Sequence, residues 1–83
     1  MPCLAPAPAQ LARWRAVAVK LGGPGTPLAV ELVEVVHAPT MLQFARVSAA
    51  ARFAASQHVG ESRLLAEQTA AEIDEEMRAR ISE

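Results

Sequence analysis

The side chains of this sequence that are best suited to acid–base chemistry are carboxylates near its C-terminal end. The densest group comprises Glu72, Asp74, Glu75 and Glu76. Two carboxylates can act as general acid and general base, or bind a cation, where a cleft shifts their pKa values. These four instead follow one another around a predicted helix, and Arg78 and Arg80 lie one turn after two of them. We interpret the group as a solvent-facing helix surface without catalytic residues.

Nucleophilic and metal-binding residue types are scattered along the chain. His37 and His58 are separated by a whole predicted helix, and the single cysteine is Cys3. No Cys/His cluster has the spacing of a zinc site, and no serine lies in a GxSxG setting. We interpret both histidines as helix-end residues that bond terminal carbonyls. The sequence therefore predicts a non-enzymatic protein with no cofactor and no bound metal.

The composition limits how much stability a single chain can reach. The 83 residues suffice for one domain, whose core often supplies only a few kcal/mol at this size. The hydrophobic fraction of 52% relies on alanine, and the aromatic residues are Trp14, Phe44 and Phe53. Small domains usually gain further stability from disulfides, metals or association. Because the sequence has one cysteine and no metal cluster, it favours association with another chain as the additional source of stability.

Charge is unevenly distributed along the sequence. Residues 1–30 carry three basic residues and no acid, whereas the remainder has nine acids against five arginines. A basic, acid-free and amphipathic N-terminus is typical of organellar presequences, although this one has no serine before Ser48. We expect a cytoplasmic protein without a transmembrane segment, because no run approaches ~20 apolar residues. An organelle matrix is the alternative location if residues 1–21 act as a presequence.

Hydrophobic periodicity predicts an all-α fold, a small bundle of three to four helices. The helical domain is expected over residues 9–83, after a disordered Pro/Ala-rich tail at residues 1–8. The predicted helices cover about residues 9–21, 27–36, 40–59 and 61–82.

Helix-end signals support several of these boundaries. Thr26 precedes Pro27, which suits an N-cap followed by the first helical residue. Thr40 and Gln43 fit a capping box, in which the hydroxyl bonds the Gln43 backbone and the glutamine side chain reaches back. Gly60 is the expected stop for the helix that Thr40 begins.

Residues 28–36 are the ambiguous segment. Four valines favour a strand by propensity. Glu31 and Glu34, however, are three residues apart, so they share one face of a helix but would point to opposite faces of a strand. We therefore favour a helix. The alternative is a ribbon-helix-helix-like dimer in which residues 28–36 form a strand that pairs between two chains.

VGESRLLAEQ at residues 59–68 resembles the turn and second-helix start of ribbon-helix-helix antitoxins and repressors. The resemblance implies a small dimeric DNA-binding protein, and a helix-turn-helix over residues 53–67 is a related alternative. The strand that would enter the DNA groove carries two glutamates, and the helix-turn-helix would present Glu61 and Glu67 with one arginine. Such acidic surfaces repel phosphates. Nucleic acid is therefore the disfavoured partner.

The predicted helix over residues 40–59 is apolar on two faces. One stripe consists of Phe44, Val47, Ala51 and Ala55, and a second, roughly opposite, of Leu42, Ala49 and Phe53. Two apolar faces require two neighbours, and small residues four apart let a neighbouring backbone come close. Because the chain is short and rich in alanine, we predict that one face is for another chain.

The sequence therefore predicts a helical protein–protein interaction or assembly module, either a homo-oligomer or a small subunit of a larger complex. Its partner is expected to be itself or another helical protein. The predicted interface consists of Phe44, Val47, Ala50, Ala51, Ala54, Leu65, Ile73, Met77 and Ile81.

Overall fold

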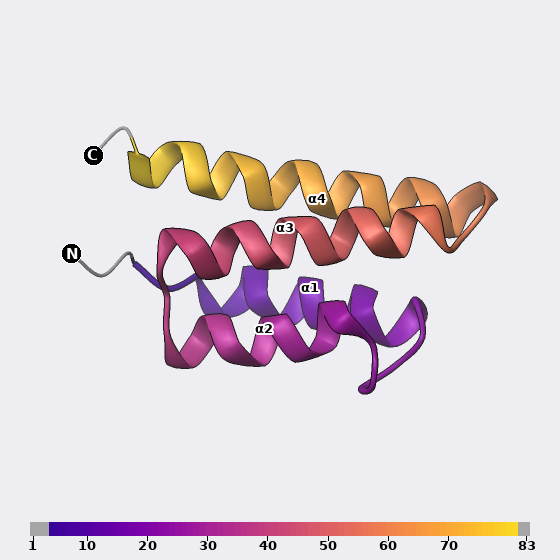
Figure 1. Cartoon of the computed structure of the whole chain (residues 1–83), viewed down its shortest axis with the longest axis horizontal. Helices are drawn as coiled ribbons and strands as arrows, with labels where there is room; N and C mark the ends of the chain where they lie inside the picture. The colour runs from indigo at the N-terminus through magenta and orange to yellow at the C-terminus, as the bar shows by residue number, and fades with distance from the viewer. Residues whose placement is uncertain (1–3, 82–83) are drawn as a thin grey trace.

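The computed structural model describes residues 4–81, and this part of the chain forms four α-helices without a strand (Figure 1). The helices are α1 (Pro8–Lys20), α2 (Pro27–His37), α3 (Met41–Ser56) and α4 (Gly60–Ile81). The prediction of a small all-α bundle is confirmed. Residues 1–3 of the predicted tail and residue 82 of the predicted last helix lie outside the described residues.

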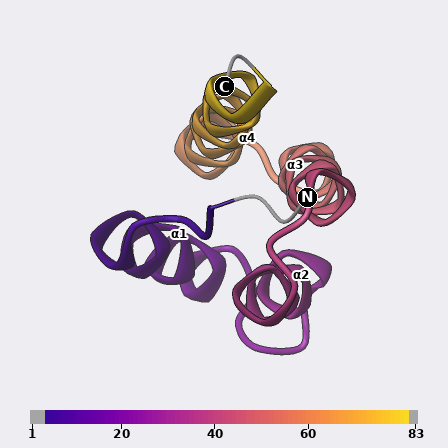
Figure 2. The same ribbon diagram turned by 90° about the vertical axis from the view of Figure 1, so that its left-hand side faces the viewer.

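The four helices surround one core in chain order (Figure 2). α1 contacts α2 and α4, and α3 contacts the same two helices from the other side. The radius of gyration is 11.8 Å, which matches the value of about 12 Å for a compact chain of this length. α3 therefore has two neighbours within its own chain.

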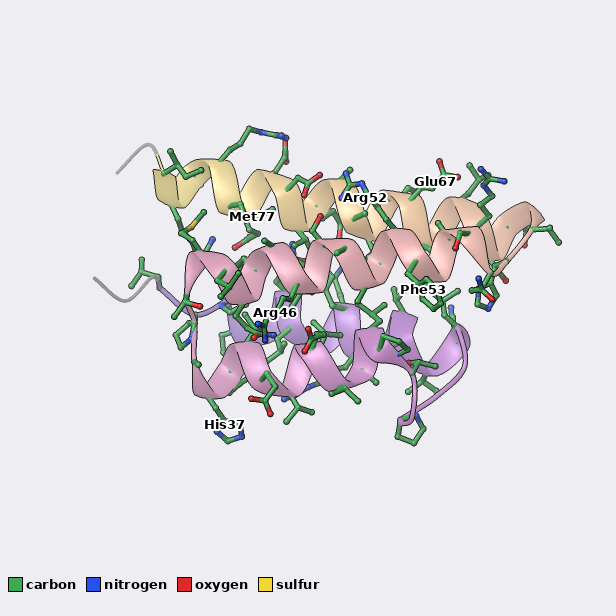
Figure 3. The ribbon with its side chains drawn as sticks, in the orientation of Figure 1. His37, Arg46, Arg52, Phe53, Glu67 and Met77 are labelled. Atoms are coloured by element: carbon green, nitrogen blue, oxygen red, sulfur yellow. The ribbon has the colours of Figure 1, made fainter. Side chains whose placement is uncertain are left out.

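α2 shows why the strand alternative for residues 28–36 is wrong. Leu28, Leu32 and Val35 recur at helical spacing, and all three are buried in the core. Burial of this helical face outweighs the strand propensity of the valines, most of which lie on the outer side. α2 ends at His37, whose exposed side chain is labelled in Figure 3.

Both predicted threonine N-caps are formed. Thr40 Oγ1 accepts a hydrogen bond from Gln43 N at 3.0 Å, as expected. The reciprocal half of the capping box is wrong, because Thr40 N already donates to the carbonyl of Ala38. The Gln43 side chain instead donates to Glu31 O at 3.2 Å. A side chain expected to close a local cap therefore joins α3 to α2.

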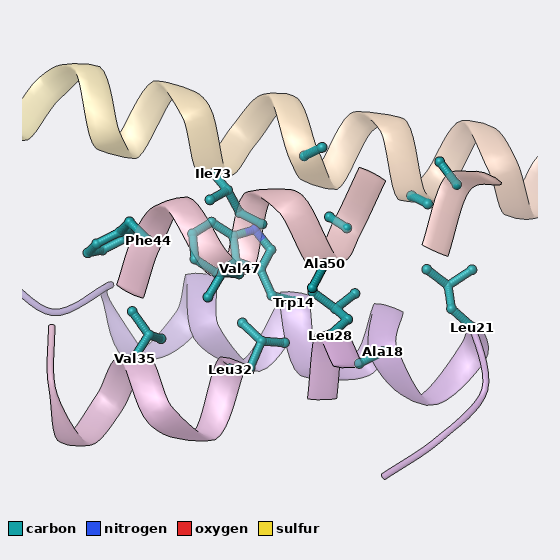
Figure 4. Close-up of a cluster of buried hydrophobic side chains, with 14 of the residues drawn as sticks. Trp14, Ala18, Leu21, Leu28, Leu32, Val35, Phe44, Val47, Ala50 and Ile73 are labelled. Atoms are coloured by element: carbon teal, nitrogen blue, oxygen red, sulfur yellow. The ribbon is translucent and has the colours of Figure 1, made fainter. Parts of the chain in front are cut away.

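Trp14 occupies the centre of the core (Figure 4). Its side chain is 1% exposed and lies among large apolar residues from the other three helices. The largest of these fully buried neighbours in the cluster are Phe44, Leu28, Leu32, Ile73, Val35 and Val47. The indole Nε1 donates to Glu72 Oε1 at 3.1 Å, so its polar atom keeps a partner although the ring is buried. The ring thus fixes α1 to the bundle and its N–H fixes α1 to α4.

α3 ends at Ser56, earlier than the limit of 59 expected from the sequence. His58 explains the difference, because its Nδ1 lies 2.7 Å from the carbonyl oxygen of Ala54 and its backbone N donates to Ala55 O. These bonds satisfy carbonyls of the last helical turn and agree with the predicted helix-end role of this histidine. The prediction that Gly60 ends this helix is wrong, because Gly60 is the first residue of α4, where its φ of 63° lets the chain turn from α3 into α4.

Residues 4–7, within the segment expected to be a disordered tail, lie against the C-terminal end of α4. Pro6 is buried, and Arg80 donates to the carbonyls of Leu4 at 2.7 Å and Ala5 at 3.3 Å. The Arg80 guanidinium also lies 4.3 Å from the centre of the Phe44 ring, a distance typical of a cation–π contact. One arginine of α4 therefore contacts both the N-terminal segment and α3.

Trp14→Ala should lower the free energy of unfolding by about 3–5 kcal/mol, because it leaves a cavity in the core. Such a loss is comparable with the whole stability of a small domain. Val19→Ala, on the exposed side of α1, is the matched control and should change the free energy of unfolding by less than about 0.5 kcal/mol. Urea unfolding followed by circular dichroism measures both variants. If Trp14→Ala and Val19→Ala lowered the free energy of unfolding equally, the central position of Trp14 in the core would be contradicted.

Candidate docking surface

The nine residues predicted to face a partner lie mostly inside the single chain. Five of them belong to its core, namely Phe44, Val47, Ala50, Ala51 and Ile73. Three are half-buried, namely Ala54, Leu65 and Met77. Ile81, at the end of α4, is 72% exposed. In this fold the predicted faces of α3 and α4 are therefore largely covered by helices of the same chain.

The second apolar stripe of α3 remains exposed. Leu42, Ala49 and Phe53 follow an i, i+7, i+11 spacing on the side of α3 that faces away from the core. The exposed fractions of Leu42 and Phe53 are 64% and 52%. The stripe is visible in the sequence, yet the predicted interface contains none of its residues. Local periodicity identifies two apolar faces of α3 without showing which one the chain itself covers.

An apolar groove runs beside this stripe, between α2 and α3. It has a volume of about 650 Å³ and is lined by Gly25, Pro27, Val30, Glu31, Arg46, Ala49, Ala50 and Phe53. We call it the α2–α3 groove. Figure 3 shows Arg46 and Phe53 on the same side of the bundle, where α3 passes over α2. Val30 is 49% exposed, so both helices contribute accessible apolar surface to the groove.

The α2–α3 groove also contains two opposite charges that do not pair with each other. Arg46 comes from α3 and Glu31 from α2, and both side chains line the groove. The ion pairs found among residues 4–81 join other residues, namely Arg13–Glu72, Arg52–Asp74, Arg63–Glu67 and Arg80–Glu76. The groove therefore combines an apolar floor with one cation and one anion that have no ionic partner in this part of the chain.

The acidic group of α4 takes part in the packing of the bundle, and three of its members, Glu72, Glu75 and Glu76, line a hollow of about 440 Å³ together with Arg13. Glu72 pairs with Arg13 of α1 at 2.7 Å, in addition to accepting the Trp14 indole N–H. Glu76 pairs with Arg80 at 2.8 Å, which confirms one of the predicted i, i+4 pairs. With Asp74, which pairs with Arg52 of α3, three of the four carboxylates are bound to arginines.

Asp74 lies in a polar contact between α3 and α4. Ser48 Oγ donates to Asp74 Oδ1 at 2.6 Å, and the Arg52 guanidinium donates to both residues. The hydrogen bond from Arg52 lowers the pKa of Asp74, with partial burial opposing the shift and Ser48 adding to it. Arg78, the partner expected from sequence spacing, adds a weaker coulombic attraction. A carboxylate that is kept ionised in this way is suited to an ion pair and unsuited to a general acid.

No group of three or more His, Cys, Asp or Glu side chains within the described residues is placed to hold a metal ion. Among the helices of residues 4–81, none has both the length and the hydropathy that crossing a membrane requires. No protein-family model matches the chain, and comparisons with curated proteins and with solved structures give no match either.

Asp74→Asn should remove a pH-dependent part of the stability. Because the folded-state pKa of Asp74 is lowered, the carboxylate stabilises the fold above its unfolded-state pKa of about 3.9. This contribution is lost as the pH falls through the lower folded-state pKa. We expect the variant to lose up to about 1 kcal/mol of unfolding free energy at pH 7, because Arg52 is more than half exposed, and much less at pH 2.

Urea unfolding at the two pH values measures this difference. Glu75→Gln, an exposed neighbour on the same helix, is the control for general loss of negative charge. If Asp74→Asn lost the same amount of unfolding free energy at pH 7 and at pH 2, the charge of Asp74 would not be the cause of the loss.

Proposed function

We propose that this protein is a non-enzymatic helical interaction module, and that it docks its partner on the α2–α3 groove and the adjoining Leu42–Phe53 stripe of α3. The observation that carries the proposal is Phe53, an aromatic side chain that is half exposed at the edge of an apolar groove. Contiguous exposed apolar patches with polar rims are typical of protein interaction sites. The partner is a second helical surface, either of this chain or of another protein.

The shape of the surface suits a helix as the docked element. Phe53 borders the α2–α3 groove and also a smaller hollow of about 90 Å³ on the side of Leu21 and Leu28. Ala49 has a small side chain, which lets an opposing backbone approach α3 closely. An amphipathic helix laid in such a groove places side chains on both sides of Phe53. Covering the exposed half of this ring would contribute about 1 kcal/mol.

The acidic and basic side chains outside the groove support an interaction role over an enzymatic one. Glu72, Asp74 and Glu76 are each bound to an arginine, so two of the three carboxylates in the hollow lined by Glu72, Glu75 and Glu76 are paired with a cation. The polar residues that a catalytic site would need are therefore used to hold α4 against its neighbours.

A DNA-binding repressor or antitoxin is not supported by a specific observation. The ribbon-helix-helix form requires a strand at residues 28–36, where the chain forms α2. As a helix, this segment has Glu31 half-exposed and Glu34 exposed. Two carboxylates on the same side disfavour a phosphate backbone.

A photoactivatable benzoylphenylalanine in place of Phe53 tests the proposed surface. In an extract of the source cells, illumination should join this position to a discrete partner, because Phe53 belongs both to the α2–α3 groove and to the adjoining stripe of α3. The same substitution at Leu64, which is exposed on α4 away from the groove, is the matched control and should give no such product.

Competition makes the test specific. Excess unlabelled wild-type chain should suppress the product formed at position 53, whereas unlabelled Phe53→Ser chain should not. Crosslinked products of equal yield from positions 53 and 64, or no crosslinked product at either position, would contradict the proposal.

A further inference from the structure

We infer that the partner on the α2–α3 groove is a second copy of this chain, in a two-fold symmetric dimer that pairs Arg46 of each chain with Glu31 of the other. The inference rests on the proposed function, because it identifies the occupant of the same surface. Arg46 and Glu31 both line the groove, and neither has an ionic partner within the described residues.

A two-fold axis makes this surface complementary to itself. In such an interface the same patch is used twice, so that a contact from one residue to a second is repeated in the opposite direction. A groove with one arginine and one glutamate meets its own copy with both charges matched. A partner surface with charges of a single sign would attract one of these two side chains and repel the other.

The apolar part of the groove is suited to the same arrangement. Phe53 and Val30 are each about half exposed and line the groove together with the two charges, and Leu42, one turn before Arg46 on α3, is 64% exposed. In the dimer these side chains would form the dry centre that supplies most of the affinity, while the ion pairs at its edge select the partner.

The size of the chain agrees with a dimer of this kind. A standard interface covers about 800 Å² on each partner, which is about one sixth of the 5066 Å² that the chain exposes. α2 and α3 lie side by side on one side of the bundle, so a second copy can approach both helices without displacing either of them.

Reversal of single charges tests the inference. Arg46→Glu places two glutamates in each groove, and Glu31→Arg places two arginines there, so each variant should repel its own copy. Neither side chain is buried, and each variant is expected to keep the helical circular dichroism spectrum of the wild type. Sedimentation equilibrium should show a wild-type dimer at micromolar concentration and a dissociation constant raised about tenfold or more in each variant.

Mixing the two variants gives the decisive result. One chain then has two glutamates and the other two arginines in the groove, so an equimolar mixture should form a heterodimer with an affinity near that of the wild type. The double variant with both reversals should recover a homodimer. Glu75→Arg, a reversal on the exposed side of α4, is the control and should leave the wild-type dimer unchanged.

The possible results distinguish a failure of the dimer inference from a failure of the proposed docking function. A wild-type chain that stays monomeric at about 100 μM, or a mixture that associates no better than either variant alone, would overturn the dimer. If the photo-crosslink at position 53 still reached a different protein, the docking surface would stand with another occupant. If a wild-type dimer formed but Phe53→Ser and both charge reversals left its dissociation constant unchanged, the dimer would use another face and this inference would be wrong.

Discussion

Burial of Trp14 is the constraint on which the rest of the bundle depends. Five of the eight core residues that α3 and α4 contribute are alanines, whose small side chains fill little volume. The indole of α1 supplies that volume, and Glu72 satisfies its N–H. The same carboxylate accepts a hydrogen bond from Arg13. A basic helix is thereby held against an acidic one, so the charge asymmetry of the sequence becomes complementarity between two neighbouring helices.

This arrangement makes the N-terminal region part of the fold. Leu11, Trp14 and Ala18 form the apolar face of α1, and that face fills the core. Arg80 adds a second attachment, because it bonds the carbonyls of residues 4 and 5 while lying against Phe44. The N-terminal region is therefore attached to the bundle both by the apolar face of α1 and by the bonds from Arg80.

The features that depend on local periodicity could be predicted from the sequence, and those that depend on the relative placement of helices could not. The helical state of α2 follows from the spacing of Leu28, Leu32 and Val35, which the fold buries. The side-chain partners differ from the local expectation because a neighbouring helix offers a competing group. Gln43 bonds a carbonyl of α2 instead of its own cap, and Asp74 takes Arg52 of α3 as its main partner. Sequence spacing defines candidates within a helix but contains no information on how α3 crosses α2 and α4.

The proposed docking surface could not be predicted from the sequence for the same reason, because only the packing of the helices decides which face of α3 stays exposed. α3 has two apolar stripes, and α2 and α4 together cover the one that contains Phe44 and Val47. The other stripe holds Phe53, one of three aromatic residues in the whole sequence. A chain with so few large apolar side chains gains stability by burying each of them, so leaving one half exposed sacrifices part of a small core. That cost is offset if the ring is buried in a complex. The scarcity of aromatic residues is therefore the physical reason why the half-exposed Phe53 supports the proposed docking surface.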